Sequence, residues 1–307
     1  MKINKPIFWN SLNLISISLI PLSLITNIIN FFKSFIVEKK FKIKSICVGN
    51  IYVGGTGKTP LVLMINEILR NKYKTVFIKK KYSDQIDEQK ILSRYGKLIC
   101  LKYRKYALKI AHKKKYQLAI LDDGLQEKGI KYNISIVCFN SSDLIGNGLV
   151  LPAGPLREQI SNILNYDVAF LNGIEKNLGF EKYLKKLNPK LKIFRAKYVP
   201  KNLKSFNLNK KYLMFSGIGN PSEFKKTLKK NKFDLKKIVI FPDHYRYKKH
   251  EIANIKKIAK EKNLNIVTNE KDYNRLSKSD RKNIQYLSIE LRVEKEKEFK
   301  EFLLKNL

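Results

Sequence analysis

The chain has 307 residues, of which 44% are apolar, so it can bury a full hydrophobic core and disorder is not expected. It carries 63 basic against 26 acidic residues, which gives a formal net charge of +37. Cys47, Cys100 and Cys138 lie far apart, without a CxxC pair or a histidine at ligand spacing, so neither a disulfide framework nor a zinc site is indicated, and a reducing cytoplasm fits.

The positive charge comes mostly from lysines that are scattered through every segment of the chain. A nucleic-acid-binding protein would show basic residues interleaved with aromatic ones on a common platform, and no such pattern is evident. Two interpretations remain. The charge reflects compositional drift toward Lys, Ile and Asn with a general attraction to anionic surfaces, or it has a dedicated electrostatic role. We expect no nucleic-acid partner.

Residues 6–32 contain no charged side chain, and this stretch is long enough to cross a bilayer. Pro21 and the interspersed Asn and Ser residues are more typical of a helix that lies in the membrane interface. Basic residues flank the segment on both sides, so they do not set its orientation. We expect residues 1–40 to form a membrane-associated segment, spanning or interfacial. The alternative is a buried helical hairpin of a soluble domain.

Short β-rich runs alternate with helical stretches after residue 44. The predicted strands are 45–48, 75–78, 98–101, 118–121, 134–139 and 168–171, with helices at 61–70 and 105–114. This alternation predicts an α/β fold with a doubly wound, mostly parallel sheet.

A second series of elements begins near residue 192 and predicts a smaller α/β lobe. Its strands are expected at 193–194, 212–216, 238–241, 265–268 and 285–289, and its helices at 222–228 and 250–261. The polar stretch around residues 200–209 has little periodic apolar content, as domain boundaries often do. We therefore predict a nucleotide-binding domain at 41–205 and the smaller C-terminal lobe at 206–307.

A glycine-rich turn separates an apolar strand from a helix near residue 54, which is the context of a P-loop NTPase-like nucleotide site. Its backbone amides can face phosphate oxygens, Lys58 can reach the β and γ phosphates, and Thr59 can hold Mg²⁺. The usual spacing would put the first glycine at position 52, where this chain has Tyr52. The loop residues predicted to bind a nucleoside triphosphate are Gly54, Gly55, Thr56, Gly57, Lys58 and Thr59.

Two carboxylates follow the apolar run 118–121, at Asp122 and Asp123. The carboxyl ends of parallel strands face the crevice in which doubly wound sheets bind ligands. We therefore expect Asp122 and Asp123 to hold Mg²⁺ together with Thr59. The alternative is a solvated turn at the end of a strand.

Several separated motifs resemble the tetraacyldisaccharide 4'-kinase family, the lipid A 4'-kinases of Gram-negative bacteria. In the first domain they are Val48-Gly49-Asn50 leading into residues 54–60, residues 122–126, Gly146-Asn147-Gly148 and residues 151–158. In the second lobe they are residues 216–221, Pro242-Asp243-His244 and residues 268–272. With the apolar N-terminus included, the resemblance spans almost the whole chain.

The resemblance implies an ATP-dependent kinase with Mg²⁺ as cofactor. Its substrate would be the lipid A disaccharide precursor, a tetraacylated glucosamine disaccharide 1-phosphate that is phosphorylated on its 4' hydroxyl. The anionic inner-membrane surface would be its second partner, at the cytoplasmic face of the bacterial inner membrane, with the N-terminal segment as the anchor. A membrane-associated P-loop ATPase or GTPase that acts as a switch is the alternative, but it would not need residues 151–158 or 242–244.

The family also implies roles for individual residues. Lys58 would act on the phosphates as a catalytic residue, and Asp87 would accept the hydroxyl proton with the help of His244. The alternative for Asp87 is an ordinary surface carboxylate, and the alternative for His244 is a merely hydrogen-bonded histidine. The family's Gly-Asp-Glu is here Ile86-Asp87-Glu88, its Ser-Arg-Gly-Tyr is Lys79-Lys80-Lys81-Tyr82, and the residue after Gln126 is Glu127 instead of His.

The remaining candidates lie around the expected crevice. Asn50, Gln126 and Arg157 are assigned to the substrate, and Glu158 is assigned to the metal. A structural pair between Arg157 and Glu158 is the alternative for these last two residues.

Overall fold

The computed structural model describes residues 6–81, 86–173, 175–243 and 245–307, and it does not describe the side chains of Ile86 and Asp87. The chain forms two compact units. The large unit comprises the described residues up to Lys197 together with Leu291–Leu307, and the small unit comprises Tyr198–Glu290.

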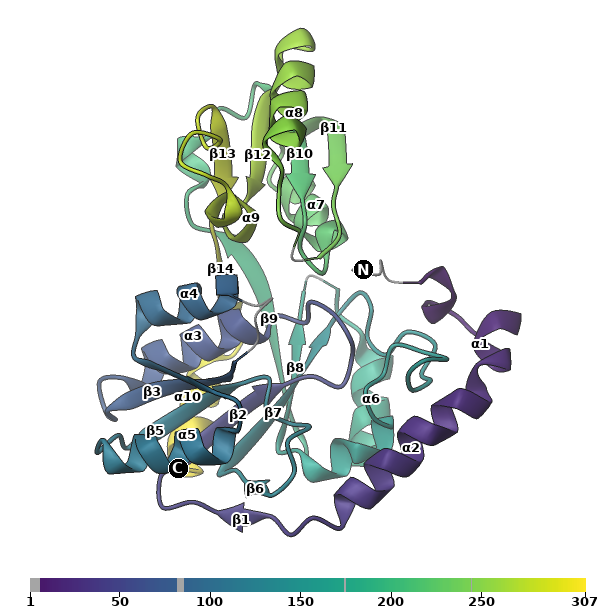
Figure 1. Ribbon diagram of the computed structural model, residues 1–307, viewed down its shortest axis with the longest axis vertical. Helices are drawn as coiled ribbons and strands as arrows, with labels where there is room; N and C mark the ends of the chain where they lie inside the picture. The colour runs from purple at the N-terminus through teal and green to yellow at the C-terminus, as the bar shows by residue number, and fades with distance from the viewer. Residues whose placement is uncertain (1–5, 82–85, 174, 244) are drawn as a thin grey trace. The chain divides into compact units, whose positions relative to one another are not determined.

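An eight-stranded sheet forms the centre of the large unit, in the order β14-β9-β8-β7-β2-β5-β3-β4 (Figure 1). Neighbouring strands from β9 to β4 pair in parallel, so the expected doubly wound, mostly parallel sheet is confirmed. The strands are β2 Lys44–Gly49, β3 Thr75–Lys80, β4 Leu98–Leu101, β5 Leu118–Asp122, β7 Ile134–Asn140, β8 Val168–Asn172, β9 Lys192–Pro200 and β14 Ile289–Val293.

Five helices accompany this sheet among the residues described: α3 Lys58–Leu69, α4 Ile86–Tyr95, α5 Arg104–Lys113, α6 Leu178–Leu187 and α10 Glu296–Lys305. The minor elements are the paired strands β1 Lys39–Lys40 and β6 Ile130–Lys131, and the 3-10 helix η2 Ile160–Asn165. The sequence predicted α3 and α5. It did not predict α4, α6 or α10. In α6 and α10 three lysines each obscure the apolar stripe, and α4 has few apolar residues.

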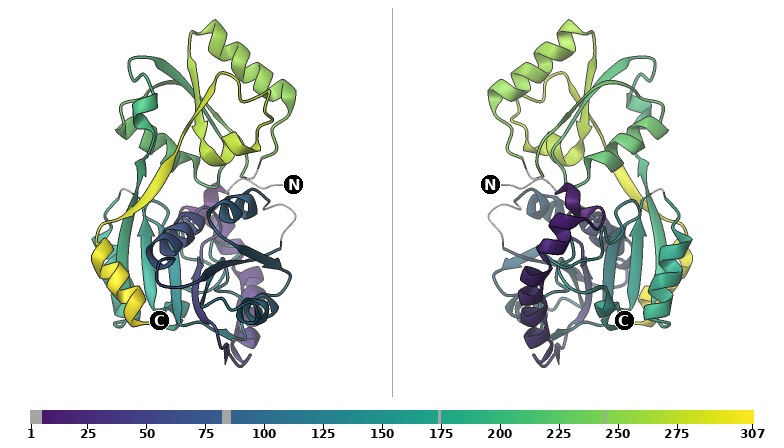
Figure 2. Two further views of the ribbon diagram at one scale, coloured as in Figure 1. Left: turned by 90° about the vertical axis from the view of Figure 1, so that its left-hand side faces the viewer. Right: turned by 90° about the vertical axis from the view of Figure 1, so that its right-hand side faces the viewer.

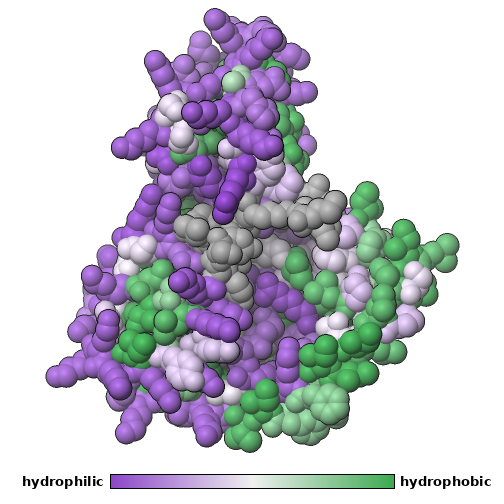
Figure 3. Space-filling view, viewed as in Figure 1, coloured by the Kyte–Doolittle hydropathy of each residue, from purple (hydrophilic) through white to green (hydrophobic). Residues whose placement is uncertain are grey.

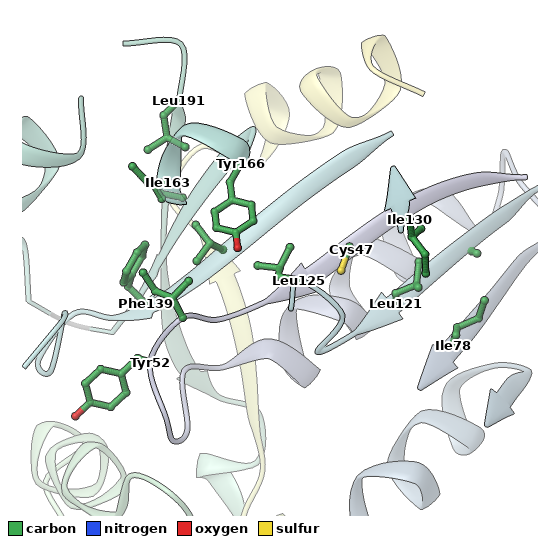
Figure 4. Packing of buried hydrophobic residues seen from close by; sticks show 14 of the residues in the cluster. Cys47, Tyr52, Ile78, Leu121, Leu125, Ile130, Phe139, Ile163, Tyr166 and Leu191 are labelled. Carbon is green, nitrogen blue, oxygen red and sulfur yellow. The ribbon is translucent and has the colours of Figure 1, made fainter. Parts of the chain in front are cut away.

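The core follows from the alternation of side chains along the strands. Ala119 and Leu121 of β5, Ala169 and Leu171 of β8, and apolar residues of α5 and α6 form one buried cluster (Figure 4, where Leu121 is labelled). Phe170 lies between two cluster members, so it points to the opposite face. There it contacts Phe299 of α10, with ring centroids 5.4 Å apart.

The C-terminal segment belongs to the large unit, although the sequence predicted residues 206–307 as one lobe. Strand β14 joins the large sheet beside β9, and Phe194 of β9 packs on Phe299 of α10 (Figure 2, where α10 is yellow). The run 193–194 likewise lies in the large sheet, and the expected strand 285–289 is divided at Ser288. Amphipathic patterns show that an element is half-buried but do not identify the sheet that covers it.

The small unit is built on its own four-stranded parallel sheet, in the order β11-β10-β12-β13. Its strands are β10 Lys211–Ser216, β11 Asp234–Ile240, β12 Asn265–Asn269 and β13 Ile284–Leu287. Its helices are η3 Leu203–Ser205, α7 Pro221–Lys230, α8 Lys249–Glu261 and α9 Glu270–Arg275. This confirms the prediction of a second, smaller α/β lobe.

The N-terminal segment forms η1 Ile7–Trp9, α1 Leu14–Ser18 and α2 Ile20–Ser34. Most of its large apolar side chains are exposed, from Ile20 at 37% to Ile7 and Leu14 at 86%, which contradicts the alternative of a buried hairpin. Figure 3 shows these apolar side chains gathered over α1 and α2. None of the helices within the described ranges is both long enough and apolar enough to cross a membrane.

Replacing Phe299 by alanine tests the return of the C-terminus to the large unit. The ring is fully buried, so Phe299→Ala should lower the free energy of unfolding by about 3–5 kcal/mol. Urea denaturation followed by circular dichroism measures this loss. The half-buried Phe302 on the same helix is the control, and Phe302→Ala should cost clearly less. Equal and small losses for both variants would contradict the packing of α10 on β8 and β9.

Candidate active site

The glycine-rich loop connects β2 to α3 and ends in a left-handed residue. Gly57 caps the helix at φ 81° and ψ 24°, a conformation that glycine adopts without strain, and Lys58 begins α3. Tyr52 is buried in the core cluster and bridges Leu156 in the antiparallel sense. The loop therefore has a tyrosine that anchors it where the usual motif has its first glycine.

Three neighbouring segments hold the loop through its backbone. Asn172, at the end of β8, donates from Nδ2 to Thr56 O at 2.6 Å. Gln126 Nε2 donates to Asn50 O at 2.8 Å, and the Arg157 amide donates to Ile51 O at 2.7 Å. The loop is thus fixed in place from β8, from the turn after β5 and from the 150–158 segment.

The Asn50 side chain lies inside this loop. It is fully buried, and its Nδ2 donates to Tyr52 O at 2.5 Å and Gly54 O at 3.2 Å. These contacts shape the phosphate loop from within. The sequence assigned Asn50 to the substrate, whereas its amide hydrogens are used by the loop itself.

Asp122 ends β5 as a fully buried carboxylate. Its Oδ2 accepts hydrogen bonds from Lys79 Nζ at 2.7 Å and from Thr59 Oγ1 at 3.3 Å. Its Oδ1 is buried and has no hydrogen-bond partner among the residues described. Such an atom is costly to bury unless a ligand satisfies it.

Asp123 adopts a left-handed conformation, at φ 58°, which turns its side chain toward two cations. Its Oδ1 lies 2.9 Å from Arg157 Nη1 and 3.7 Å from Lys58 Nζ. Burial by itself would raise the pKa of Asp123, but Lys58 and Arg157 outweigh it and hold the pKa below its usual value. The carboxylate is therefore ionised at neutral pH.

Lys79 is one of two residues of the site that sequence reasoning missed. The register of β3 on β5 places Lys79 opposite Asp122, and the lysine is 1% exposed. Its Nζ lies 2.7 Å from Asp122 Oδ2 and 2.7 Å from Glu88 Oε2 on α4. Burial would lower the pKa of Lys79, but Asp122 and Glu88 raise it above the usual value. A protonated lysine thus joins β5 to the first turn of α4.

Arg104 was also missed, and it explains a departure from the family pattern. Glu127, which stands where the family has His, pairs with the buried Arg104 at 2.6 Å. Arg104 Nη2 donates to Asp123 O at 2.5 Å and to Asp122 O at 3.3 Å. The Arg104–Glu127 pair therefore holds the backbone of the acidic strand end.

Thr59 and Asp122 fit a magnesium ion. The orphaned Asp122 Oδ1 and the adjacent Thr59 hydroxyl are hard oxygen donors, as Mg²⁺ prefers. No three His, Cys, Asp or Glu side chains converge as a metal site in the part of the chain that is described. This is consistent with Mg²⁺, which binds through one or two protein oxygens together with waters and substrate phosphates.

Glu158 and Arg157 have separate partners. Glu158 is 3% exposed, accepts from the Tyr166 hydroxyl, and accepts from Asn162 Nδ2 at 3.0 Å and Gln126 Nε2 at 3.4 Å. Arg157 instead pairs with Asp123 and donates to Gln126 Oε1 at 3.2 Å. The Glu158 carboxylate is thus occupied by neutral donors, and the alternative of an Arg157–Glu158 pair is not what the structure shows.

The two residues assigned to proton transfer cannot be placed as side chains. The Asp87 backbone belongs to the first turn of α4, but its side chain lies outside the described structure. His244 lies outside the described residues altogether.

The motifs of the small unit meet at Asp272, which is fully buried. Its Oδ2 accepts from Gly217 N at 2.7 Å and from Asn269 Nδ2 at 2.5 Å, and its Oδ1 pairs with Arg275 at 2.7 Å. The 216–221 and 268–272 motifs therefore form one network at the carboxyl ends of β10 and β12.

The family model for tetraacyldisaccharide-1-P 4'-kinase (LpxK) matches residues 15–307. The chain is similar to the tetraacyldisaccharide 4'-kinase of Pelagibacter ubique, at 44% identity over 99% of this chain and 98% of that protein. It is similar to that of Rickettsia akari at 33% identity, over 95% of this chain and 94% of that protein.

A solved structure shares the fold. The crystal structure of LpxK from Aquifex aeolicus in complex with ATP has a TM-score of 0.70 to this chain. The two sequences are 23% identical, and the likeness covers 95% of this chain and 99% of that chain.

Removing the Lys79 charge tests the buried pair. Lys79→Met should lower the free energy of unfolding by about 3–5 kcal/mol, because it leaves the Asp122 carboxylate buried and uncompensated. Thermal denaturation of the two proteins side by side measures the loss. The exposed Lys81 gives a matched control, and Lys81→Met should change stability by less than about 0.5 kcal/mol. Equal stability of both variants would show that Lys79 does not neutralise Asp122.

Proposed function

The chain belongs to the tetraacyldisaccharide 4'-kinase family, and from this premise we propose how its residues carry out the reaction of lipid A biosynthesis that defines the family. As a member it is a kinase that phosphorylates the 4' position of the tetraacylated disaccharide 1-phosphate. The observation that carries the proposal is that Lys58 and Thr59, at the start of α3, contact the acidic end of β5, where one Asp122 oxygen is unpaired among the described residues.

ATP is the proposed phosphate donor, and the loop from Gly54 to Thr59 is its proposed site. The LpxK of Aquifex aeolicus was crystallised with ATP, which supports this assignment. Lys58 begins α3 and would turn from Asp123 toward the β and γ phosphates. The backbone amides at the start of α3 would contribute partial positive charge to the same oxygens.

Thr59 Oγ1 and Asp122 Oδ1 are the proposed protein ligands of Mg²⁺. When bound, the ion would neutralise charge on the transferred phosphoryl group. Asp123, which lies next to Asp122, is proposed to keep its ion pair with Arg157 when Lys58 turns toward the phosphates. The contacts of Glu158 with Tyr166 and Asn162 favour a role in fixing the 157–166 segment over the metal role assigned from sequence.

Asp87 is the proposed proton acceptor of the 4' hydroxyl, and His244 is proposed to assist it. The tie between Lys79 and Glu88 supports the first assignment, because it fixes the turn of α4 that contains Asp87 to the Asp122 strand end. Arg157 and Gln126, which contact each other beside Asp123, are proposed to orient the disaccharide.

Contact with the anionic inner-membrane surface, at its cytoplasmic face, is proposed for α1 and α2. Their exposed apolar side chains would enter the interface, and Lys33, Lys39 and Lys40 would meet anionic head groups. An acceptor that carries acyl chains resides in such a surface, so its kinase needs a way to reach it.

Transfer to the disaccharide tests the proposed chemistry. With ATP, Mg²⁺ and tetraacyl disaccharide 1-phosphate in mixed micelles, the protein should form the 1,4'-bisphosphate, detected by mass spectrometry. Lys58→Ala should lower kcat by roughly two to three orders of magnitude, because one charge on the phosphates is lost. Lys72→Ala, an exposed lysine after α3, is the control. An active Lys58→Ala enzyme, or ATP hydrolysis without transfer, would favour the switch alternative.

Polar substitutions on α2 test the membrane contact. Ile25 and Phe32 are 56% and 66% exposed, so Ile25→Gln with Phe32→Gln should leave the fold intact. Loss of these two apolar side chains should weaken the affinity for anionic vesicles, measured by co-sedimentation, by roughly tenfold or more. Ile240→Gln, at 59% exposure in the small unit, is the control. Unchanged vesicle binding by the double variant would contradict the proposed contact.

A further inference from the structure

Helix α2 is amphipathic, but its apolar face is exposed and its polar face is turned inward, which is the reverse of the usual arrangement in a soluble protein. From Ile20 to Phe32 its exposed side chains are apolar, whereas Ser23 is 5% exposed and Thr26, Asn27 and Asn30 are half-buried. Positions 23, 26, 27 and 30 are spaced three and four residues apart, so they share one face of the helix. The polar face of α2 is therefore turned toward the protein.

This polar face binds one particular segment, Val150–Arg157. Ser23 Oγ donates to Val150 O at 2.8 Å and accepts from Ala153 N at 3.1 Å. Asn30 Nδ2, two turns further along, donates to Arg157 O at 3.0 Å. The preceding 3-10 helix adds a fourth bond, from Trp9 Nε1 to Pro152 O at 3.1 Å.

The same segment contacts the phosphate site on its other side. Pro155 O accepts from Val53 N at 2.9 Å, and the Arg157 amide donates to Ile51 O at 2.7 Å, both within the glycine-rich connection. The Arg157 side chain reaches Asp123 Oδ1 at 2.9 Å. The segment thus lies between a helix with an apolar outer surface and the acidic strand end.

Backbone groups in this position need protein partners. Buried N–H and C=O groups are costly to leave unpaired, and lipid chains offer no hydrogen bonds. The Ser23 hydroxyl and the Asn30 amide supply these bonds from the one face of α2 that a membrane would not wet. Apolar residues at these two positions would make the helix more apolar as a whole, so membrane affinity alone does not explain why they are polar.

We propose that Ser23 and Asn30 are positioning residues, through which helix α2 holds the Val150–Arg157 segment and, with it, Arg157 against Asp123. The inference rests on the proposed kinase chemistry and on the proposed membrane contact of α2. It adds that the helix that meets the lipid surface also completes the site of transfer. The rate of phosphoryl transfer then depends on the inner face of α2, and membrane binding depends on its outer face.

Two substitutions on the inner face of α2 test its role separately from that of the outer face. Ser23→Ala and Asn30→Leu remove the polar contacts while keeping or raising the apolar character of the helix. Each should lower kcat by about tenfold or more, because a displaced segment moves Arg157 away from Asp123. The KM for ATP should change less than kcat, because Asn172 and Gln126 also hold the phosphate loop. Ser34→Ala is the matched control, since the Ser34 hydroxyl bonds only Phe31 O of its own helix in the described contacts, and its kcat should be unchanged.

Co-sedimentation with anionic phosphatidylglycerol vesicles provides the second readout. Both variants should bind at least as well as the wild-type protein. A fall in kcat that always parallels a loss of vesicle binding would overturn the proposal, since α2 would then be an anchor and nothing more. Failure of the wild-type protein itself to bind vesicles would refute the membrane contact, while the kcat values, measured in mixed micelles, would still decide the positioning role.

A double-mutant cycle asks whether Asn30 acts through Arg157. In an Arg157→Ala background, Asn30→Leu should lower the remaining kcat by less than about twofold, because the group that it positions is already absent. Full additivity of the two losses would overturn the proposal, and so would a kcat of Ser23→Ala and Asn30→Leu within twofold of the wild-type value.

Discussion

The buried acidic end of β5 is the constraint on which the rest of the large unit depends. Asp122 is fully buried and the Asp123 side chain is 15% exposed, and two adjacent carboxylates in such a place are unstable without compensating charge. The compensation comes from separate elements: Lys79 from β3, Lys58 from α3 and Arg157 from the 150–158 segment, while Arg104 of α5 holds the two backbone carbonyls. The sheet order and the helix positions are therefore tied to one charge cluster. That cluster leaves a single Asp122 oxygen unpaired among the described residues, and this oxygen is proposed to bind Mg²⁺.

The same charge cluster connects the turn that contains the proposed proton acceptor with the helix that is proposed to contact the membrane. On one side Lys79 reaches Glu88 and so fixes the turn of α4 that contains Asp87. On the other side Arg157 leads through its own segment to the polar face of α2, whose outer face is apolar. A donor proposed to bind the glycine-rich loop and an acceptor proposed to be reached at a lipid surface can react only if both sites are fixed to one frame. The acidic strand end provides that frame.

The sequence predicted the phosphate loop, the acidic strand end and the strands around them because these depend on local patterns: apolar runs, glycines and their spacing. It could not predict Lys79, which is one of three consecutive lysines in a lysine-rich chain. Only the register that sets Lys79 opposite Asp122 distinguishes it from its exposed neighbour Lys81. Arg104 could not be predicted either, because it is one basic residue among many and only the fold brings it to Glu127.

The return of β14 and α10 to the large sheet is a long-range contact, and the alternation that predicted a strand near residue 289 does not identify its partner. The proton acceptor assigned from the family pattern, Asp87, stays a prediction.

A crystal structure of this protein with a non-hydrolysable ATP analogue, Mg²⁺ and the disaccharide acceptor would show directly whether the acidic end of β5 organises the site. The γ phosphate should lie within hydrogen-bond distance of Lys58 Nζ, and Mg²⁺ should bind Thr59 Oγ1 and the unpaired oxygen of Asp122, with Lys79 still paired to the other oxygen. The Asp87 carboxylate should face the 4' hydroxyl. A metal ion held by Glu158, or a nucleotide bound away from the Gly54–Thr59 loop, would contradict this arrangement.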